Sequence, residues 1–275
     1  MNPDLTLLPN PEHALFIDPR TPNVFDRISE FRDVSVRAQN LGFILEKTAC
    51  GDSAIPSADG DSLFFPELGL SFSLESCQAV HGTMRFEPEP MLRVEMDLAD
   101  RMNALNFGVG CYSEESGKMR SLITDFASET ISVDTLENWR TTAQQAVHMC
   151  PCCVQQSMWR AQYPKRHPIY QIFEVAVESK LPLHLRLRDE NVDLTAELTP
   201  SFVHASKGWI RLGSPDVTLH TNLYYLHAMG IRNRHRDGEV IACLDIYSSH
   251  GRRMLEISAD EAAASVWKDL CEGVS

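Results

Sequence analysis

Four side chains that can bind a metal lie close together near the middle of the sequence. The segment 146–153 reads AVHMCPCC and contains His148, Cys150, Cys152 and Cys153. Imidazole nitrogens and thiolates are ligands that zinc prefers, and Cys150 and Cys153 have the Cys-x-x-Cys spacing of zinc sites and dithiol redox centres. A non-catalytic metal-binding or thiol-sensing protein that uses these four residues is therefore one hypothesis.

The same segment also fits a second kind of site, in which an iron porphyrin is bound. The imidazole of His148 can bind haem iron through one nitrogen while the other nitrogen donates a hydrogen bond. Cys150-Pro151 is similar to the Cys-Pro pairs of haem-regulatory motifs. A third alternative is a linker whose thiols have no function, because free cysteine packs as a small apolar residue. The residues alone leave all three interpretations open.

A basic stretch in an otherwise acidic chain forms the second candidate site. The chain has 25 Lys and Arg residues against 38 Asp and Glu residues, which gives a net charge of −13. The stretch IRNRHRDG contains Arg232, Arg234 and Arg236, whose guanidinium groups suit the propionates of a haem. His227 precedes them and is a further candidate for contact with the ligand. The alternative is a hairpin edge that charge protects from pairing with another chain.

Composition and length exclude several classes of protein. The 275 residues are 43% hydrophobic and 23% charged, which is typical of a folded chain of one large or two small domains. An acidic surface repels phosphate, so we expect no nucleic-acid partner. No apolar run approaches the roughly 20 residues that span a bilayer, and the N-terminus lacks the basic region of a signal peptide. We therefore expect a cytoplasmic protein without membrane insertion.

Hydrophobic spacing in the first half predicts one helix followed by strands. Proline-rich residues 1–22 are predicted to form an irregular arm. Val24, Phe25, Ile28 and Phe31 recur at three- and four-residue steps, which predicts a helix over 23–41. Alternating apolar residues, as in LSFSL and MLRVEMDL, predict strands between residues 62 and 110.

The second half repeats this order of elements. An apolar face predicts a helix over 168–180. Ser258 and Glu261 have the spacing of a capping box, which predicts that a C-terminal helix begins there. Between the two helices, alternation predicts strands at 183–187, 192–198, 208–212, 216–226, 228–233 and 239–247.

The two halves can be aligned with each other. Residues 92–98 align with 240–246, and 132–134 align with 258–260, which leaves an insertion within 106–131 of the first half. Such a duplication predicts an α+β fold of two similar repeats, each an antiparallel sheet flanked by helices. The expected boundaries are an arm over 1–22, repeat 1 over 23–145, a linker with the cysteine-rich segment over 146–166, and repeat 2 over 167–275.

Residues 199–257 resemble the HemS/ChuS-type family of cytoplasmic haem-trafficking and haem-degrading proteins. That family is also built from two structural repeats. The residues that carry the resemblance are Lys207-Gly208-Trp209-Ile210, Thr218-Leu219-His220, Ala228, Arg232, the turn Asp237-Gly238, and Leu244-Asp245-Ile246-Tyr247 with Gly251.

The resemblance implies haem as the cofactor and a haem donor or acceptor protein as a partner. The family has its axial histidine in an Asp-Val-His-type motif after the first repeat, and Val147-His148 stands at that place here. Two positions depart from the family pattern: Asn233 stands where a basic residue is usual, and Ser258 where a tyrosine is frequent. The implied function is haem trafficking or haem degradation, with zinc or thiol chemistry as the alternative.

Overall fold

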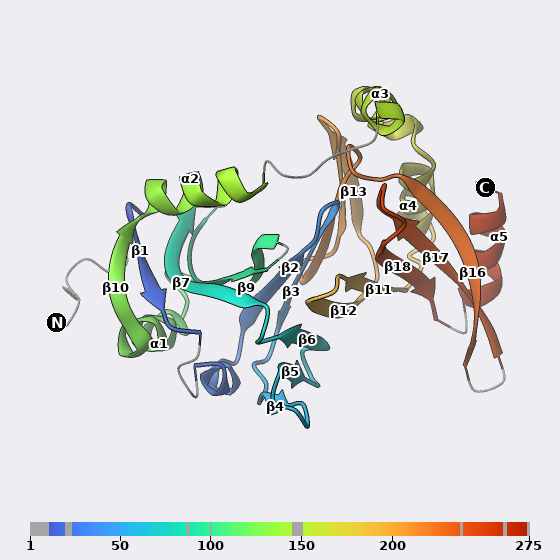
Figure 1. Cartoon of the computed structure of the whole chain (residues 1–275). Helices are drawn as coiled ribbons and strands as arrows, with labels where there is room; N and C mark the ends of the chain where they lie inside the picture. Colours follow the sequence, from blue (N-terminus) through green and yellow to red (C-terminus); the bar gives the residue numbers. More distant parts are fainter. Residues whose placement is uncertain are drawn as a thin grey trace. The chain divides into compact units, whose positions relative to one another are not determined.

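The chain forms two compact units of antiparallel strands and helices, which confirms the predicted α+β class (Figure 1). Unit 1 contains residues 1–38 and 48–147, and unit 2 contains residues 39–47 and 148–275. The computed structural model describes residues 11–19, 24–86, 89–99, 101–144, 151–236, 239–260 and 263–273. Within these ranges only the backbone is described for residues 101–103, 143–144, 151–153, 235–236 and 239.

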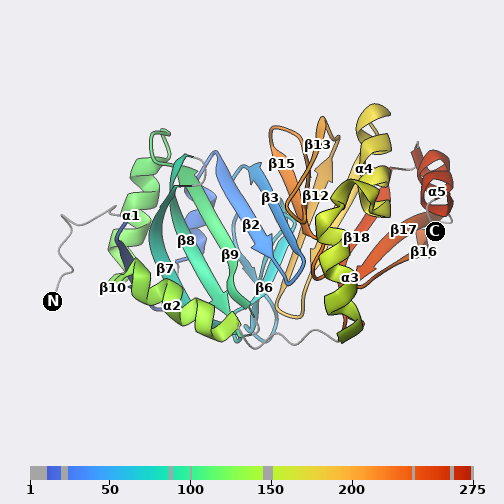
Figure 2. The same cartoon turned by 90° about the horizontal axis from the view of Figure 1, so that it is seen from above.

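Unit 1 is built on a main sheet in the order β10-β1-β7-β8-β9-β2, in which each neighbouring pair is antiparallel (Figure 2). A smaller group of strands pairs in the order β6-β5-β4. The elements are β1 (His13–Ile17), the 3₁₀ helix η2 (Asp26–Glu30), β2 (Val34–Gln39), β4 (Ile55–Pro56), β5 (Ser62–Phe65), β6 (Leu70–Ser73), β7 (Cys77–Phe86), β8 (Pro90–Leu98), β9 (Arg101–Gly110), α1 (Ser116–Phe126), β10 (Ala127–Ser132) and α2 (Val133–Gln144).

Unit 2 contains two groups of antiparallel strands, in the orders β3-β15-β14-β13 and β16-β17-β18-β11-β12. No helix formed by the described residues of either unit is long and apolar enough to span a membrane. The elements are β3 (Phe43–Ala49), α3 (Pro151–Gln162), the 3₁₀ helix η3 (Pro164–Arg166), α4 (Pro168–Glu178), β11 (Leu183–Arg188), β12 (Val192–Leu198), β13 (Phe202–Ser206), β14 (Trp209–Gly213), β15 (Val217–Asn222), β16 (Ala228–Arg236), β17 (Glu239–Tyr247), β18 (Arg253–Ala259) and α5 (Ala264–Glu272).

The two faces of the main sheet of unit 1 are covered by different helices. Ile123 of α1 lies against Gly82 of β7, where a Cβ atom would approach its Cγ2 atom to 2.3 Å. Arg140 of α2 bonds carboxylates of β8 on the opposite face, and Figure 1 shows the two helices on either side of the sheet. One face is therefore apolar, while the other carries buried charges.

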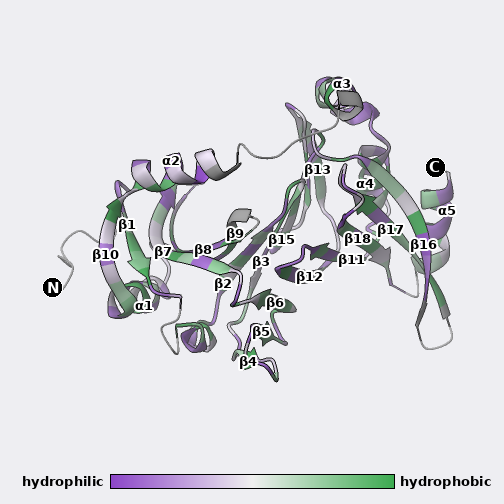
Figure 3. Ribbon diagram, viewed as in Figure 1, coloured by the Kyte–Doolittle hydropathy of each residue, from purple (hydrophilic) through white to green (hydrophobic). Residues whose placement is uncertain are grey.

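Period-two alternation explains most strands, because successive side chains of a strand point to opposite faces. In β11 the residues Leu183, Leu185 and Leu187 are buried, while the residues between them are partly exposed. Figure 3 shows the same alternation as green and purple along the strand ribbons. The predicted helix at 168–180 and the strands over 183–198 are confirmed within two residues at each end.

Two predictions for the beginning of the chain are wrong. Residues 13–17 were predicted to belong to an irregular arm, but they form strand β1. Pro11 and Pro19 flank this stretch, so its backbone N–H groups are free to pair with β7 and β10. Of the helix predicted over 23–41, only η2 forms. From residue 34 onward Val34, Val36 and Ala38 alternate into the core as β2, which pairs with β9.

Two predictions for the second half are also corrected. Residues 151–162 of the expected linker form helix α3. The C-terminal helix begins at Ala264 rather than at Ser258. Ser258 belongs to β18 and pairs with β11 and with β17, so hydrogen bonding on both edges outweighs the local capping signal.

Candidate functional site

The basic stretch of the sequence forms one strand of a three-stranded meander in unit 2. Arg232 and Arg234 stand two residues apart on β16 and therefore share a face. The register pairs Asp245 of β17 with Glu256 of β18, and both carboxylates contact these arginines. We call this group, together with Arg253, the arginine face.

Two carboxylates bind the arginines at hydrogen-bond distance. Arg232 donates from Nε to Oδ2 of Asp245 at 2.7 Å and from Nη2 to Oε2 of Glu256 at 2.6 Å. Arg234 donates from Nη1 to Glu256 at 3.5 Å. Nη1 of Arg253 lies 3.0 Å from Glu256 and 3.5 Å from Asp245. Each carboxylate therefore pairs with at least two guanidinium groups.

In the arginine face the carboxylates are buried, whereas the arginine side chains are exposed. Asp245 is 1% exposed and Glu256 7% exposed. The side chains of Arg232 and Arg234 are 40% and 50% exposed. The carboxylates thus lie beneath the guanidinium groups, which form the surface that a ligand meets.

The charges of this face shift the pKa values of its members. The hydrogen bond that Arg232 donates to Asp245, together with the charges of Asp245 and Glu256, raises the pKa of Arg232 and keeps it protonated. Burial, followed by the charge of Asp245, raises the pKa of Tyr247, whose hydroxyl donates to Asp245 at 3.2 Å. Burial likewise raises the pKa of the Cys243 thiol on the same meander. The arginine face is therefore cationic at its surface and has neutral phenol and thiol groups beside it.

Donors remain available on the arginine face. Within the described part of the chain, Nη1 of Arg232 and both Nε and Nη2 of Arg234 make no hydrogen bond. A guanidinium group has five N–H donors and pairs readily with carboxylates and phosphates. The arrangement can therefore bind an anionic ligand without breaking its internal ion pairs.

The other predicted site residues are only partly placed. His227 is exposed and lies immediately before β16, where its backbone N–H donates to the carbonyl of Tyr247. Arg236 is the last residue of β16, and only its backbone is described. His148 and Cys150 lie outside the described residues, so their predicted roles are not tested.

The predicted zinc ligands Cys152 and Cys153 lie in the first turn of α3, where only the backbone is described. Among side chains in the described ranges, no group of three or more His, Cys, Asp or Glu residues is arranged to hold a metal ion. The zinc hypothesis therefore remains a prediction from the sequence.

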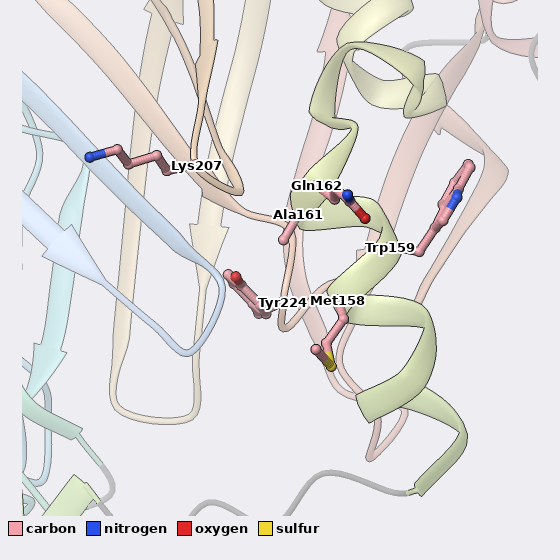
Figure 4. Close-up of a pocket in the computed structure, with 6 residues that line it drawn as sticks. All are labelled: Met158, Trp159, Ala161, Gln162, Lys207 and Tyr224. Carbon is pink, nitrogen blue, oxygen red and sulfur yellow. The ribbon is translucent and has the colours of Figure 1, made fainter.

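A groove lies beside α3, the helix that begins three residues after His148. Its volume is about 410 Å³. Met158 and Tyr224 face each other across it, while Trp159 points to the other side of the helix (Figure 4). Arg160 fixes α3 to the segment before β16 by donating from Nη1 to the carbonyl of Leu226. The full lining is Met158, Trp159, Ala161, Gln162, Lys207 and Tyr224.

Unit 1 contains a related network that is closed to solvent. Arg140 of α2 bonds Glu95 at 2.7 Å and Asp97 at 3.0 Å, and Arg85 bonds Glu95 at 2.7 Å. Both carboxylates are 0% exposed and Arg140 is 2% exposed. Burial would raise the pKa of Glu95, but the hydrogen bond from Arg85 and the charge of Arg140 lower it to about 2. This network has no guanidinium surface comparable with the arginine face.

The sequence predicted the arginines of the candidate site but not Asp245 and Glu256 of the arginine face or Lys207 and Tyr224 of the groove. In a chain with 38 acidic residues, a single Asp or Glu carries no signal. The usable signal would have been alternation, because Arg232, Arg234 and the residues paired across two strands share one face.

Solved structures with the same architecture include two haem proteins. PhuS of Pseudomonas aeruginosa, described as a heme-binding protein, matches in its apo form with a TM-score of 0.67 and 12% identity, over 94% of this chain and 86% of PhuS. ChuS of Escherichia coli O157:H7, described as a heme degrading enzyme, matches with a TM-score of 0.68 and 12% identity, over 94% of this chain and 86% of ChuS. No family profile and no curated protein sequence matches the chain. The chain therefore has a HemS/ChuS-type fold.

Proposed function

We propose that this chain binds haem through its second unit, with His148 as the axial ligand and Arg232 and Arg234 against the propionates. The observation that carries the proposal is the likeness of its fold, over 94% of the chain, to PhuS, a heme-binding protein, and ChuS, a heme degrading enzyme. The arginine face supports it, because this surface of an acidic protein presents guanidinium groups with unused donors.

The spacing of the arginines fits a dianionic porphyrin edge. Residues two apart on a strand are separated by about 6.6 Å. The two propionates of haem leave the same edge of the ring, so neighbouring guanidinium groups suit them. Arg232 and Arg234 meet this condition, whereas Arg232 and Arg236 stand about 13 Å apart along the strand. We therefore assign the propionates to the first pair and only a peripheral role to Arg236.

The proposed role is cytoplasmic haem utilisation, in which haem arrives from a donor protein and passes to an acceptor. Bound haem would supply an iron centre, while the residues of this chain orient it through an imidazole and two guanidinium groups. Haem degradation would appear as loss of the haem spectrum when oxygen and a reductant are added. Binding alone would leave the spectrum intact under the same conditions.

The test is a hemin titration followed at the Soret band. We expect saturable binding by the wild type and a changed Soret band for His148→Ala. His204→Ala is the matched control, because His204 is an exposed histidine on β13 with no proposed role. An identical band for His148→Ala and wild type would reject His148 as the ligand, and absence of saturable binding by the wild type would reject haem.

A further inference from the structure

The arginine face contains two buried carboxylates whose role is not explained by ligand contact. Asp245 and Glu256 are almost inaccessible, so they do not touch a ligand that lies on the guanidinium groups. They would also repel an anionic ligand. Nevertheless they make hydrogen bonds or ion pairs with Arg232, Arg234 and Arg253.

Holding an arginine in one orientation removes a cost from ligand binding. A free arginine side chain loses rotamer entropy when it is fixed. Arg232 is already held at two points, through Nε by Asp245 and through Nη2 by Glu256. Its remaining donor group, Nη1, is thereby oriented before a ligand arrives, which is how preorganisation increases affinity.

The closed network of unit 1 shows a different use of the same groups. There Arg140 of helix α2 covers the carboxylates of Glu95 and Asp97 and is 2% exposed, and the side chain of the strand residue Arg85 is only 16% exposed. In unit 2 the arginines come from the strands themselves and remain 40% and 50% exposed. The buried carboxylates need charged partners for folding, but these partners also keep guanidinium donors at the surface, where a ligand can reach them.

We propose that Asp245 and Glu256 are positioning residues, which hold Arg232 and Arg234 in the orientation that binds the two carboxylates of the ligand. The inference rests on the proposed haem function and names the part of the site that recognises the propionates. For the loss of either carboxylate, it predicts weaker hemin binding, whereas electrostatic repulsion alone predicts tighter hemin binding. Removing a negative charge beneath a dianion would otherwise strengthen binding, whereas loss of positioning weakens it.

The experiment compares hemin with haem dimethyl ester, in which both propionates are esterified. For Asp245→Asn we expect hemin affinity to fall about tenfold, with the affinity for the ester within about twofold of wild type. In an Arg232→Ala background, Asp245→Asn should cause no further loss of hemin affinity, because its positioning effect acts through that guanidinium group. Glu190→Gln is the control, since Glu190 is an exposed carboxylate that pairs with Arg252 in the same unit.

Glu256→Gln provides a second variant should Asp245→Asn fail to fold, which its thermal unfolding curve would show. Equal or tighter hemin binding by the folded variants would overturn the positioning role and leave the haem proposal standing. Equal losses for hemin and its ester would also overturn it, because a general structural defect does not distinguish propionates. Absence of hemin binding by the wild type would instead overturn the haem proposal, and this inference with it.

Discussion

Replacing Arg140 by methionine isolates the energetic role of the closed network in unit 1. Arg140 is 2% exposed and makes hydrogen bonds to Asp97 through Nε and Nη2 and to Glu95 through Nη1. Methionine fills most of its volume but carries no charge. Arg140→Met therefore leaves two carboxylates buried with fewer partners while creating little empty space.

The expected loss follows from the partners that remain. Glu95 keeps the two hydrogen bonds from Arg85, whereas Asp97 loses the hydrogen bonds that Nε and Nη2 of Arg140 donate to it. Removing one partner of a buried ion pair costs about 3–5 kcal/mol, a large share of the 5–15 kcal/mol that stabilises a typical domain. Adding Asp97→Asn to Arg140→Met should recover part of this loss, because it removes a buried charge that no longer has the guanidinium group of Arg140 beside it.

Urea denaturation followed by circular dichroism at pH 7 measures this loss. Arg27→Met is the matched control: Arg27 pairs with Glu30 and Asp125 at an exposed site, so we expect a loss within about 1 kcal/mol. The deficit of Arg140→Met should shrink as the pH falls toward 5, since the charge of Arg140 helps to lower the pKa of Glu95, and without it this buried carboxyl group takes up a proton more easily. A deficit no larger than that of the control would show that Arg140 does not offset the buried charges of Glu95 and Asp97.

Three further predictions concern local features of the fold. Burial, with the charge of Arg160, lowers the pKa of His167 to about 4, so the free energy of unfolding falls as the pH drops from 6.5 toward 4. His167→Asn should remove this loss, which urea titrations near pH 6.5 and near pH 4 measure. Gly82→Ala places a Cβ atom 2.3 Å from Ile123 and should lower stability by about 1–3 kcal/mol in the same assay. Arg160→Met removes the bond to the carbonyl of Leu226, and limited proteolysis should then cut within α3 faster than in the wild type. Unchanged pH dependence, unchanged stability or an unchanged cleavage rate would contradict the respective prediction.

Local patterns predicted the elements whose partners are close in sequence. Leu183, Leu185 and Leu187 alternate, and β11 pairs with its sequence neighbour β12, so this hairpin was predictable almost to the residue. Residues 34–39 could not be assigned in the same way. The helical spacing of the preceding residues Val24, Phe25, Ile28 and Phe31 extended a false helix signal into them, although Val34, Val36 and Ala38 alternate as in a strand.

Local sequence patterns likewise predict some residues of the candidate site and not others. The arginines of β16 stand out because they alternate within one short stretch of an acidic chain. Asp245 and Glu256 lie 13 and 24 residues from Arg232, and only the register of three strands brings them beneath it. A sequence without its strand register therefore predicts the charged surface but not the groups that orient it.

A crystal structure of the chain with bound hemin would show whether the second unit binds haem as proposed. We expect iron bonded to His148 and propionates at hydrogen-bond distance from Arg232 and Arg234, with Asp245 still bonded to Arg232. Iron bonded to another residue, together with propionates away from β16, would contradict the proposal.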